Sequence, residues 1–285
     1  MIQIKHVEFS YSRNAQLFTG LELSLSPGHI HGILGKNGEG KSTLLKMISG
    51  MIFPQKGEIE VLGYEPRKRQ PEMLREIFFL PEELPPITLS IENYEKVYAP
   101  FYPHFNHEQF QGYLQEFEIN SGKSQINKLS YGQKKKVFMA FGLATNTKIV
   151  LLDEPTNGLD IPSKAQFRKM TASALEDERI MLISTHQVRD LDSLIDSIII
   201  MNSHQIVFNE LCENITEKLL FSYGKEKSEG EEVLYSEENL RGFDQVSINK
   251  TGEESKLDIE LLFNTVLKNH QRIREIFSNQ NNKRF

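Results

Sequence analysis

The chain has 285 residues, a formal net charge of -6, 39% hydrophobic residues and 25% charged residues. This length suits one large domain or two modest ones with a substantial buried core. The acidic balance lacks the basic footprint of a nucleic-acid binder, and the single cysteine, Cys212, excludes an internal disulfide framework and a cysteine-rich zinc site.

No apolar run approaches the roughly 18 residues of a membrane span, and the start MIQIKHVEFS has no charged-then-apolar signal pattern. We therefore expect a cytoplasmic protein that reaches a membrane only through a partner.

The first third of the chain predicts strands separated by a glycine-rich loop and a helix. Residues 2–9 alternate like a strand, a second apolar stretch runs from Leu21 to Leu25, and residues 29–34 form a short buried strand. Residues 42–49 have helical spacing and stop at Gly50, a C-terminal cap. Further strands are predicted over residues 57–63 and 77–80.

The loop between the buried strand and this helix, GKNGEGKS (35–42), fits the P-loop pattern G-x4-G-K-[ST]. Its backbone N–H groups are expected to surround the phosphates of a nucleoside triphosphate, Lys41 to reach the β- and γ-phosphates, and Ser42 to bind Mg2+. The competing interpretation is a glycine-rich turn that carries Lys-Ser by chance. The candidate phosphate-binding residues are Gly35, Asn37, Gly38, Gly40, Lys41, Ser42 and Thr43.

The middle of the chain alternates helices with buried strands, which predicts an α/β fold with a mainly parallel sheet. Helices are expected between Asn106, an N-cap by residue type, and Ile119, over residues 130–144 and over 162–176. Strands are expected over 149–152, 180–183, 197–201 and 205–208, the last two as an antiparallel pair. After residue 212 the pattern changes, with an amphipathic helix over 257–267 and a frayed end from Ser278.

The strand at 149–152 delivers two adjacent acids, Asp153 and Glu154, to its carboxyl end, where parallel sheets build their sites. Asp153 suits binding of Mg2+ and Glu154 suits polarisation of an attacking water. The alternative, a solvated loop, loses weight because the P-loop supplies a phosphate site for them.

The pentapeptide LSYGQ (129–133) completes a set of motifs that resembles the ATP-binding cassette (ABC) ATPases, whose commonest signature is L-S-G-G-Q. The resemblance covers about residues 1–210 and implies that Ser130, Gly132 and Gln133 contact the ATP held by the other subunit of a dimer. Taken alone, Ser130 would be an ordinary helix N-cap.

Three more positions match this family. TNGLD (156–160) looks like the D-loop, with Asp160 near the opposite subunit, and His186 looks like the switch histidine that contacts the γ-phosphate. Tyr11 matches the aromatic that stacks on adenine. By residue type alone, His186 would be structural and Tyr11 would pack in the core.

Two positions depart from the family pattern. Tyr131 replaces a glycine of the signature, so its side chain must point away from the phosphate or narrow the dimer interface. Glu82 stands where the family has a glutamine that approaches Mg2+; Pro81 favours this register over one that places Glu83 there. We expect Glu82 to bind the metal when ATP and Mg2+ are present and otherwise to face solvent.

The resemblance implies an ATPase subunit that dimerises, with itself or a related ATPase, around two ATP molecules and drives a separately encoded transmembrane permease, with export favoured over import. Its location would be the inner face of the cell membrane. The expected parts are an ABC ATPase domain over 1–212, a P-loop NTPase core with an antiparallel β subdomain and a helical subdomain at about 84–145, and a C-terminal α+β accessory region over 213–285.

Two segments have open interpretations within this scheme. The aromatic segment 98–105 forms the core of the helical subdomain or a groove for the permease, and Lys134, Lys135 and Lys136 are expected on a solvated helix face. The alternative functions are a soluble cofactor-assembly ATPase and a nucleotide-dependent regulator with weak turnover.

Overall fold

The computed structural model describes residues 1–12, 15–120, 124–225, 232–240 and 242–278. Within these ranges the strands are β1 Ile2–Ser12, β2 Ala15–Leu25, β3 His29–Leu34, β4 Lys56–Val61, β5 Ile77–Leu80, β6 Ile149–Asp153, β7 Ile180–Thr185, β8 Ser197–Asn202, β9 Gln205–Leu211, β10 Leu219–Gly224, β11 Val233–Asn239 and β12 Gly242–Ile248. The α-helices are α1 Lys41–Ile48, α2 Pro71–Leu74, α3 Ile91–Tyr98, α4 His107–Glu116, α5 Tyr131–Ala144, α6 Ile161–Ser173, α7 Cys212–Lys218, α8 Ile259–Lys268 and α9 His270–Ser278. Short 3-10 turns occupy Pro66–Lys68, Ala99–Phe101, Ile126–Lys128 and Val188–Asp190.

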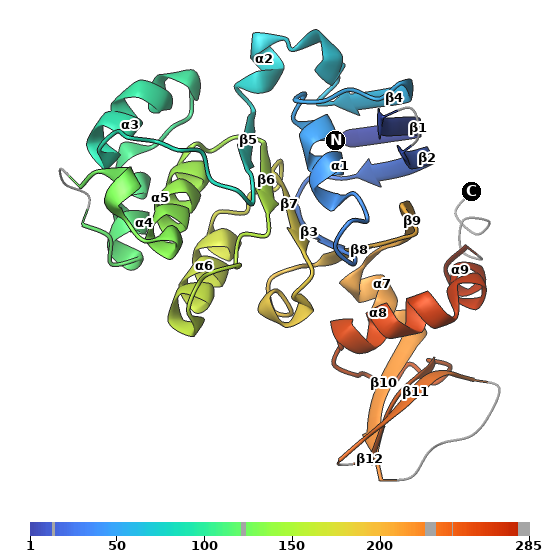
Figure 1. Ribbon diagram of the computed structural model, residues 1–285. Helices are drawn as coiled ribbons and strands as arrows, with labels where there is room; N and C mark the ends of the chain where they lie inside the picture. Colours follow the sequence, from blue (N-terminus) through green and yellow to red (C-terminus); the bar gives the residue numbers. More distant parts are fainter. Residues whose placement is uncertain (13–14, 121–123, 226–231, 241, 279–285) are drawn as a thin grey trace.

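A six-stranded sheet in the order β5-β6-β7-β3-β8-β9 forms the centre of the molecule (Figure 1). The first five strands are parallel and β9 runs antiparallel to β8. Pairing of Asp153 with Ser184 and of Leu34 with Thr185 brings the carboxyl ends of β6, β7 and β3 to one edge. The predicted α/β class and parallel core are confirmed.

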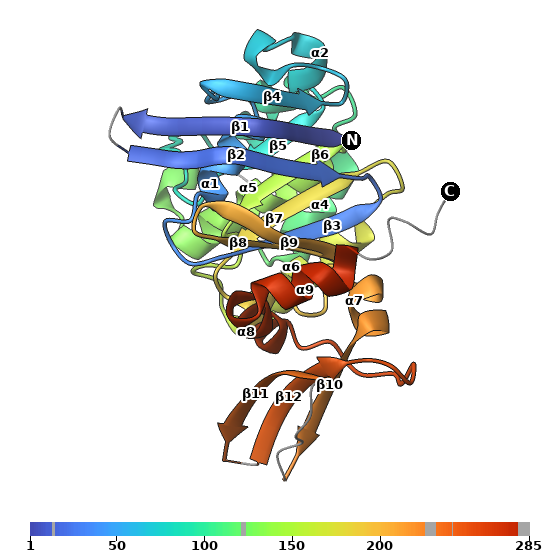
Figure 2. The same cartoon turned by 90° about the vertical axis from the view of Figure 1, so that its right-hand side faces the viewer.

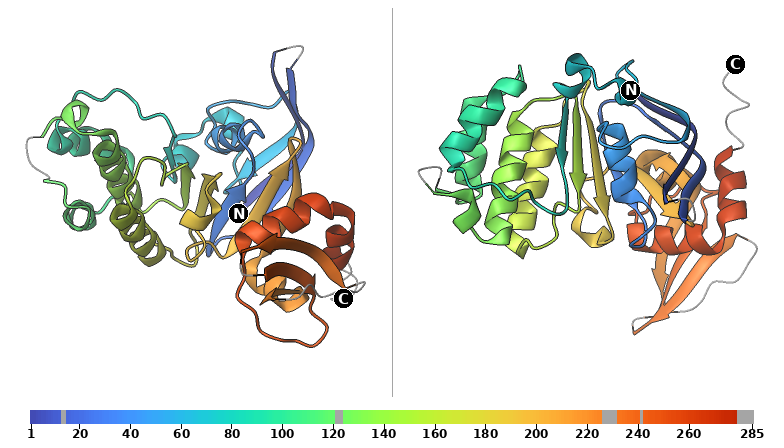
Figure 3. Two further views of the ribbon diagram at one scale, coloured as in Figure 1. Left: turned by 60° about the horizontal axis from the view of Figure 1, so that its bottom comes forward. Right: turned by 45° about the horizontal axis from the view of Figure 1, so that its top comes forward.

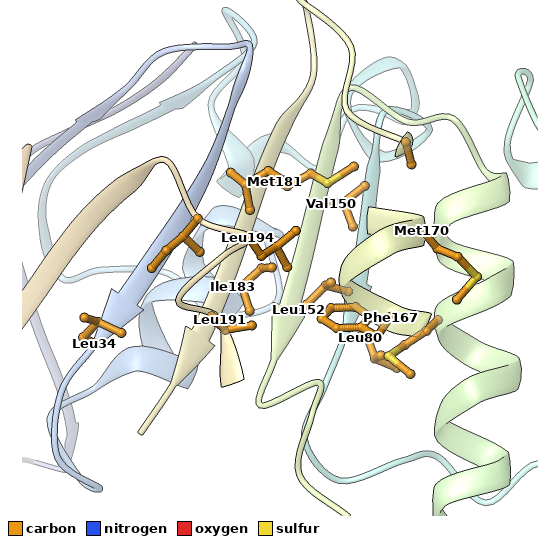
Figure 4. Packing of buried hydrophobic residues seen from close by; sticks show 14 of the residues in the cluster. Leu34, Leu80, Val150, Leu152, Phe167, Met170, Met181, Ile183, Leu191 and Leu194 are labelled. Atoms are coloured by element: carbon orange, nitrogen blue, oxygen red, sulfur yellow. The ribbon is translucent and has the colours of Figure 1, made fainter. Parts of the chain in front are cut away.

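Strand β6 shows why the buried strands lack an alternating pattern. Val150 and Leu152 belong to the apolar cluster on one face of the sheet, and Ile149 and Leu151 belong to the cluster on the other. Both faces are therefore covered, as expected for a central parallel strand. Figure 4 shows Leu152 beside Phe167 of α6, one of the helices that cover the first face.

A second sheet, in the order β2-β1-β4, lies beyond α1, so that α1 is packed between the two sheets (Figure 2). Leu44, Leu45 and Ile48 of α1 share one cluster with Ile4 of β1 and Leu182 of β7. This packing fixes the amino end of α1 against the central sheet, and so positions the loop that precedes it.

Helices α3, α4 and α5 form a separate layer on the far side of β5 (Figure 3). Their core is aromatic, since Tyr94, Phe105 and Phe110 pack against Phe141 of α5 with ring centroids 4.9 to 5.7 Å apart. Tyr102 also contacts Phe141, while Phe101 is exposed. Tyr98, Tyr102 and Phe105 of the aromatic segment 98–105 are thus half-buried against this core, which favours the core interpretation for these three residues.

The chain after β9 contains α7, a three-stranded antiparallel sheet in the order β10-β12-β11, and then α8 and α9 (Figure 1). The boundary predicted near residue 212 falls between β9 and α7. Helix α8 begins at the N-cap Asp258, which accepts from Leu261 N, and its buried face includes Leu262 and Val266. The predicted frayed tail lies mostly outside the described residues.

Candidate active site

The glycine-rich loop connects β3 to α1 and ends at the first residue of the helix. Gly40 has φ +105°, and a Cβ there would lie 2.6 Å from the ring of Phe18, so glycine is required by conformation and by space. Gly38 also has a positive φ, of +89°. The free N–H groups of the first turn of α1, with no acidic side chain among them, form an anion-binding site.

Lys41 is buried and its ammonium turns back onto the loop. Nζ donates to the carbonyl oxygen of Gly35 at 2.7 Å and of Lys36 at 3.1 Å. Burial lowers the pKa of Lys41, and Glu154 and Asp153 are the acids that oppose this shift most strongly. The loop thus holds a cation that a triphosphate could engage in place of these carbonyls.

Asp153 and Glu154 lie at the carboxyl end of β6, both buried, beside Ser184 of β7. The Ser184 hydroxyl donates to Asp153 Oδ1, and Glu154 N donates to the Ser184 carbonyl oxygen at 3.1 Å. Glu154 adopts φ +47°, an unusual conformation for a residue with a side chain, which turns the chain sharply after the strand. Ser184 is a supporting residue that the sequence did not single out.

His186 follows β7 and contacts the second acid directly. His186 Nδ1 lies 2.8 Å from Glu154 Oε1, and the Thr185 hydroxyl donates to Glu154 Oε2 at 3.4 Å. The structure therefore brings Lys41, Asp153, Glu154 and His186 to one edge of the sheet, a phosphate-binding loop beside a carboxylate that is oriented by histidine.

Tyr11 lies at the end of β1, and its hydroxyl is 2.9 Å from Thr43 Oγ1 of α1. Tyr11 is 63% exposed as a residue, and its ring meets that of Phe9 edge to face. This places an accessible aromatic surface beside the phosphate-binding loop, and the ring is not part of the core.

The signature residues occupy the amino end of α5. Ser130 and Gln133 form a capping box: Ser130 Oγ accepts from Gln133 N at 3.3 Å, and Gln133 Oε1 accepts from Ser130 N at 3.0 Å. Helices α5 and α1 lie on opposite sides of β5 and β6 (Figure 3). Ser130 thus caps its helix as residue type suggests, and this helix packs on the opposite face of the sheet from α1.

Tyr131 and Glu82, the two departures from the family pattern, contact each other. Tyr131 Oη donates to the carbonyl oxygen of Glu82 at 2.7 Å, and the ring covers Gly158. Burial and the nearby Glu82 carboxylate raise the pKa of Tyr131, which keeps the phenol protonated as a donor. Asn157 Nδ2 donates to Glu82 Oε1 at 3.2 Å. Glu82 is half-buried, and Asn157 provides a partner for its carboxylate; that Glu82 binds the metal with ATP and otherwise turns to solvent stays a prediction.

The prediction that Lys135 lies on a solvated face is wrong. Lys135 is fully buried, and its ammonium donates to the carbonyl oxygens of Glu154 and Asn157. The sequence signal was available, because Phe138 and Met139 follow Lys135 at the spacing of one helix face, and both are buried. Lys134 and Lys136 are half-buried.

Asp160 caps α6, where its Oδ1 accepts from Ser163 N at 2.9 Å. Hydrogen bonds from Ser163 lower the pKa of this carboxyl group. This contact fixes the end of the D-loop to α6. The preceding residues of the loop, 156–159, lie next to the segment of Glu82.

The C-terminal region also reaches this edge of the sheet. Arg189, in the 3-10 turn after His186, forms an ion pair of 2.8 Å with Glu260 of α8. An open pocket lies between the phosphate loop, the turn and α8, and it is lined by Gly35, Lys36, Asn37, His186, Arg189, Glu260, Phe263 and Asn264, among others.

The residues predicted to bind Mg2+ carry only oxygen donors. Ser42, Asp153 and Glu82 offer a hydroxyl and two carboxylates, the ligand types that Mg2+ prefers. In the described part of the chain, no three acidic, histidine or cysteine side chains form a metal cluster.

Comparison with known proteins gives one consistent family. The family model described as ABC transporter matches residues 18–157. The Bacillus subtilis ABC transporter ATP-binding protein NatA is 27% identical over 229 residues, which cover 78% of this chain and 90% of NatA. The methionine import ATP-binding protein MetN of Carboxydothermus hydrogenoformans is 30% identical over 225 residues, covering 73% of this chain and 65% of MetN.

Solved structures show the same fold. A dimeric ATP-binding cassette in a post-hydrolysis state, bound to ADP and Pi, superposes with a TM-score of 0.63 at 23% identity, covering 74% of this chain and 98% of that one. No helix in the described ranges is long and apolar enough to cross a membrane.

Proposed function

The chain belongs to the ABC transporter family of ATP-binding subunits, which are ATPases, and from this premise we propose that it works as a dimer that drives a separate transmembrane permease. The observation that carries the proposal is the joint position of Lys41, Glu154 and His186 at one edge of the sheet, with α5, whose N-cap is Ser130, on the opposite face of the sheet from α1. Each chain of the dimer would thus supply the phosphate loop of one ATP site and the signature residues of the other.

The reason for proposing a dimer is the separation between the amino end of α5 and the phosphate loop of the same chain. The amino end of α5 has free N–H groups and an N-cap serine, the chemistry that binds a phosphate, yet it lies away from the phosphate loop of its own subunit. A second copy, or a related ATPase, in head-to-tail orientation would place Ser130, Gly132 and Gln133 against the ATP held by the first. Asp160 and the D-loop would lie in the same interface.

In the proposed reaction, Gly35 to Thr43 hold the triphosphate and Lys41 neutralises charge on its terminal phosphates. Glu154 accepts a proton from the water that attacks the γ-phosphorus in line. His186 holds the Glu154 carboxylate through the 2.8 Å contact and is placed to turn toward the γ-phosphate when ATP fills the site. Tyr11 supplies the surface on which adenine stacks.

Ser42, Asp153 and Glu82 would hold Mg2+, which offsets the negative charge of the phosphates when bound. The protein contributes the orientation of these oxygens. Ser184 keeps Asp153 in place, and Asn157 and Tyr131 keep the segment of Glu82 in place.

The helical layer is the proposed contact with the permease. Its core is filled by aromatic side chains, whereas Val97 and Phe101 remain exposed on its surface at 50% and 64%. The predicted direction of transport, export, stays a prediction, and the relative MetN is named for import. ATP-dependent substrate movement in vesicles that carry the whole complex determines the direction.

Two measurements test the proposed function. The purified chain should hydrolyse ATP, and Glu154→Gln should lower kcat by at least about a hundredfold with ATP binding retained, as for loss of a general base. Glu178→Gln, a change to a surface acid whose side chain is 83% exposed, is the matched control. An integral membrane protein with several spanning helices should co-purify with the full chain, whereas a stable free-standing ATPase would favour the cofactor-assembly alternative.

A further inference from the structure

Lys135 is a charged side chain with no exposed surface, at the point where α5 meets the loop after β6. Its ammonium donates to the Glu154 carbonyl oxygen and, at 3.1 Å, to the Asn157 carbonyl oxygen. A buried ammonium is costly unless it is hydrogen-bonded and compensated by negative charge. The two carbonyl groups accept hydrogen bonds from two of its three N–H groups, but they carry no net charge that would balance the charge of the ammonium.

Burial lowers the pKa of Lys135 to about 8, and the acids whose charge opposes this shift are, in decreasing order, Glu82, Glu154 and Asp153. Asn157 connects the two sides, because its carbonyl oxygen accepts from Lys135 while its Nδ2 donates to Glu82 Oε1. The aromatic ring of Tyr131, one turn earlier on α5, lies 5.5 Å from the ammonium.

The two carbonyl groups that Lys135 holds belong to the segment that sets the position of Glu154. Glu154 has the left-handed φ of +47°, which a side-chain residue adopts only when its surroundings enforce it. Lys135 binds the carbonyl at this residue and the one three positions later, and so closes the turn from the helix side. A displacement of this turn would move the Glu154 carboxylate relative to the phosphate loop.

We propose that Lys135 is a positioning residue for ATP hydrolysis, which fixes the turn from Glu154 to Asn157 and compensates the charge that Glu82 brings to the site. This inference rests on the proposed role of Glu154. It assigns a joint purpose to two residues. The Glu82 carboxylate adds negative charge to a site that already holds Glu154 and Asp153, and the buried ammonium of Lys135 offsets it, with Asn157 in contact with both Lys135 and Glu82.

The first test is Lys135→Met, which keeps the length of the side chain and removes its charge and donors. At saturating Mg2+, kcat should fall by about tenfold to a hundredfold, the loss expected from a misplacement of about 1 Å. The KM and Kd for ATP should stay within about twofold. Lys134→Met on the same helix is the matched control. Amides of residues 154–157 should exchange hydrogen faster in Lys135→Met without nucleotide, a readout that does not depend on turnover.

The second test separates charge from packing. Lys135→Gln keeps an amide donor, and it should lose less activity than Lys135→Met; it also serves if the methionine variant does not fold. Adding Glu82→Gln to either variant at saturating Mg2+ should recover at least about threefold of the lost kcat, because the carboxylate whose charge Lys135 compensates is then absent. A purely structural role for Lys135 would give additive losses instead.

Failure of the inference about Lys135 can be distinguished from failure of the proposed function. If the wild type hydrolyses ATP and Glu154→Gln does not, but Lys135→Met matches the wild type in kcat and in hydrogen exchange, Lys135 is not a positioning residue and the proposed function stands. If Glu154→Gln remains active, the role of Glu154 is wrong, and the inference about Lys135 fails with it.

Discussion

Glu82→Gln changes the charge of the site with little change in its contacts. The glutamine Oε1 can still accept from Asn157 Nδ2, and the bond from Tyr131 Oη goes to the main-chain carbonyl, which the substitution does not touch. One unit charge at about 4 Å and an effective dielectric near 20 interacts by about 4 kcal/mol with another. Because Glu82 is half-buried, solvent reduces the interaction below this upper bound. About a third of it, roughly 1.4 kcal/mol, already corresponds to a factor of ten in a binding constant.

We therefore expect the Mg2+ concentration for half-maximal ATP hydrolysis to rise by about tenfold or more in Glu82→Gln. The assay is the rate of phosphate release at fixed, saturating ATP over a titration of free Mg2+. Glu83→Gln, an exposed neighbour with the same change of charge, is the control and should leave the titration unchanged. An identical metal requirement in Glu82→Gln and the wild type would show that Glu82 does not bind the metal.

Three further changes have defined outcomes. Tyr131→Phe removes the donor to the Glu82 carbonyl and should lower stability by about 1 kcal/mol, measured as a decrease of the denaturation midpoint; no change would mean that the contact is replaced by water. Tyr11→Ala should raise the KM for ATP by about tenfold and Tyr11→Phe by less than about twofold, since the ring and not the bond to Thr43 would bind adenine; equal effects would exclude stacking. Burial raises the pKa of Cys212 to about 12, so iodoacetamide at pH 8 should label the unfolded chain and leave the native thiol largely unmodified; rapid native labelling would contradict its burial.

The elements that could be predicted from the sequence are those set by local patterns. Residues 77–80 form β5 at the predicted bounds, and α4 begins after the predicted N-cap Asn106, whose side chain accepts from Gln109 N. The helix predicted over 162–176 ends earlier, at Ser173, in the structure. An α+β region is predicted over 213–285, but not the individual strands β10, β11 and β12, because they are short and a charged segment, residues 225–232, separates β10 from the other two.

The sequence by itself determined the chemistry of the site. The P-loop, the Asp153-Glu154 pair and His186 each follow a buried strand, and parallel strands bring their carboxyl ends to one edge whatever the rest of the chain does. Contiguous residues carry each of these features, so their order along the chain was sufficient to recognise them.

Only the tertiary structure decided how the unusual residues are connected. Tyr131 reaches Glu82 across 49 positions, Asn157 reaches Glu82 across 75, and Lys135 reaches Glu154 across 19. By composition a run of three lysines looks solvated, whereas Phe138 and Met139 indicate a buried face at Lys135; the packing of α5 against the loop after β6 decides between the two. The partner of each polar group is chosen by packing between separate elements, and no local pattern in the chain encodes that choice.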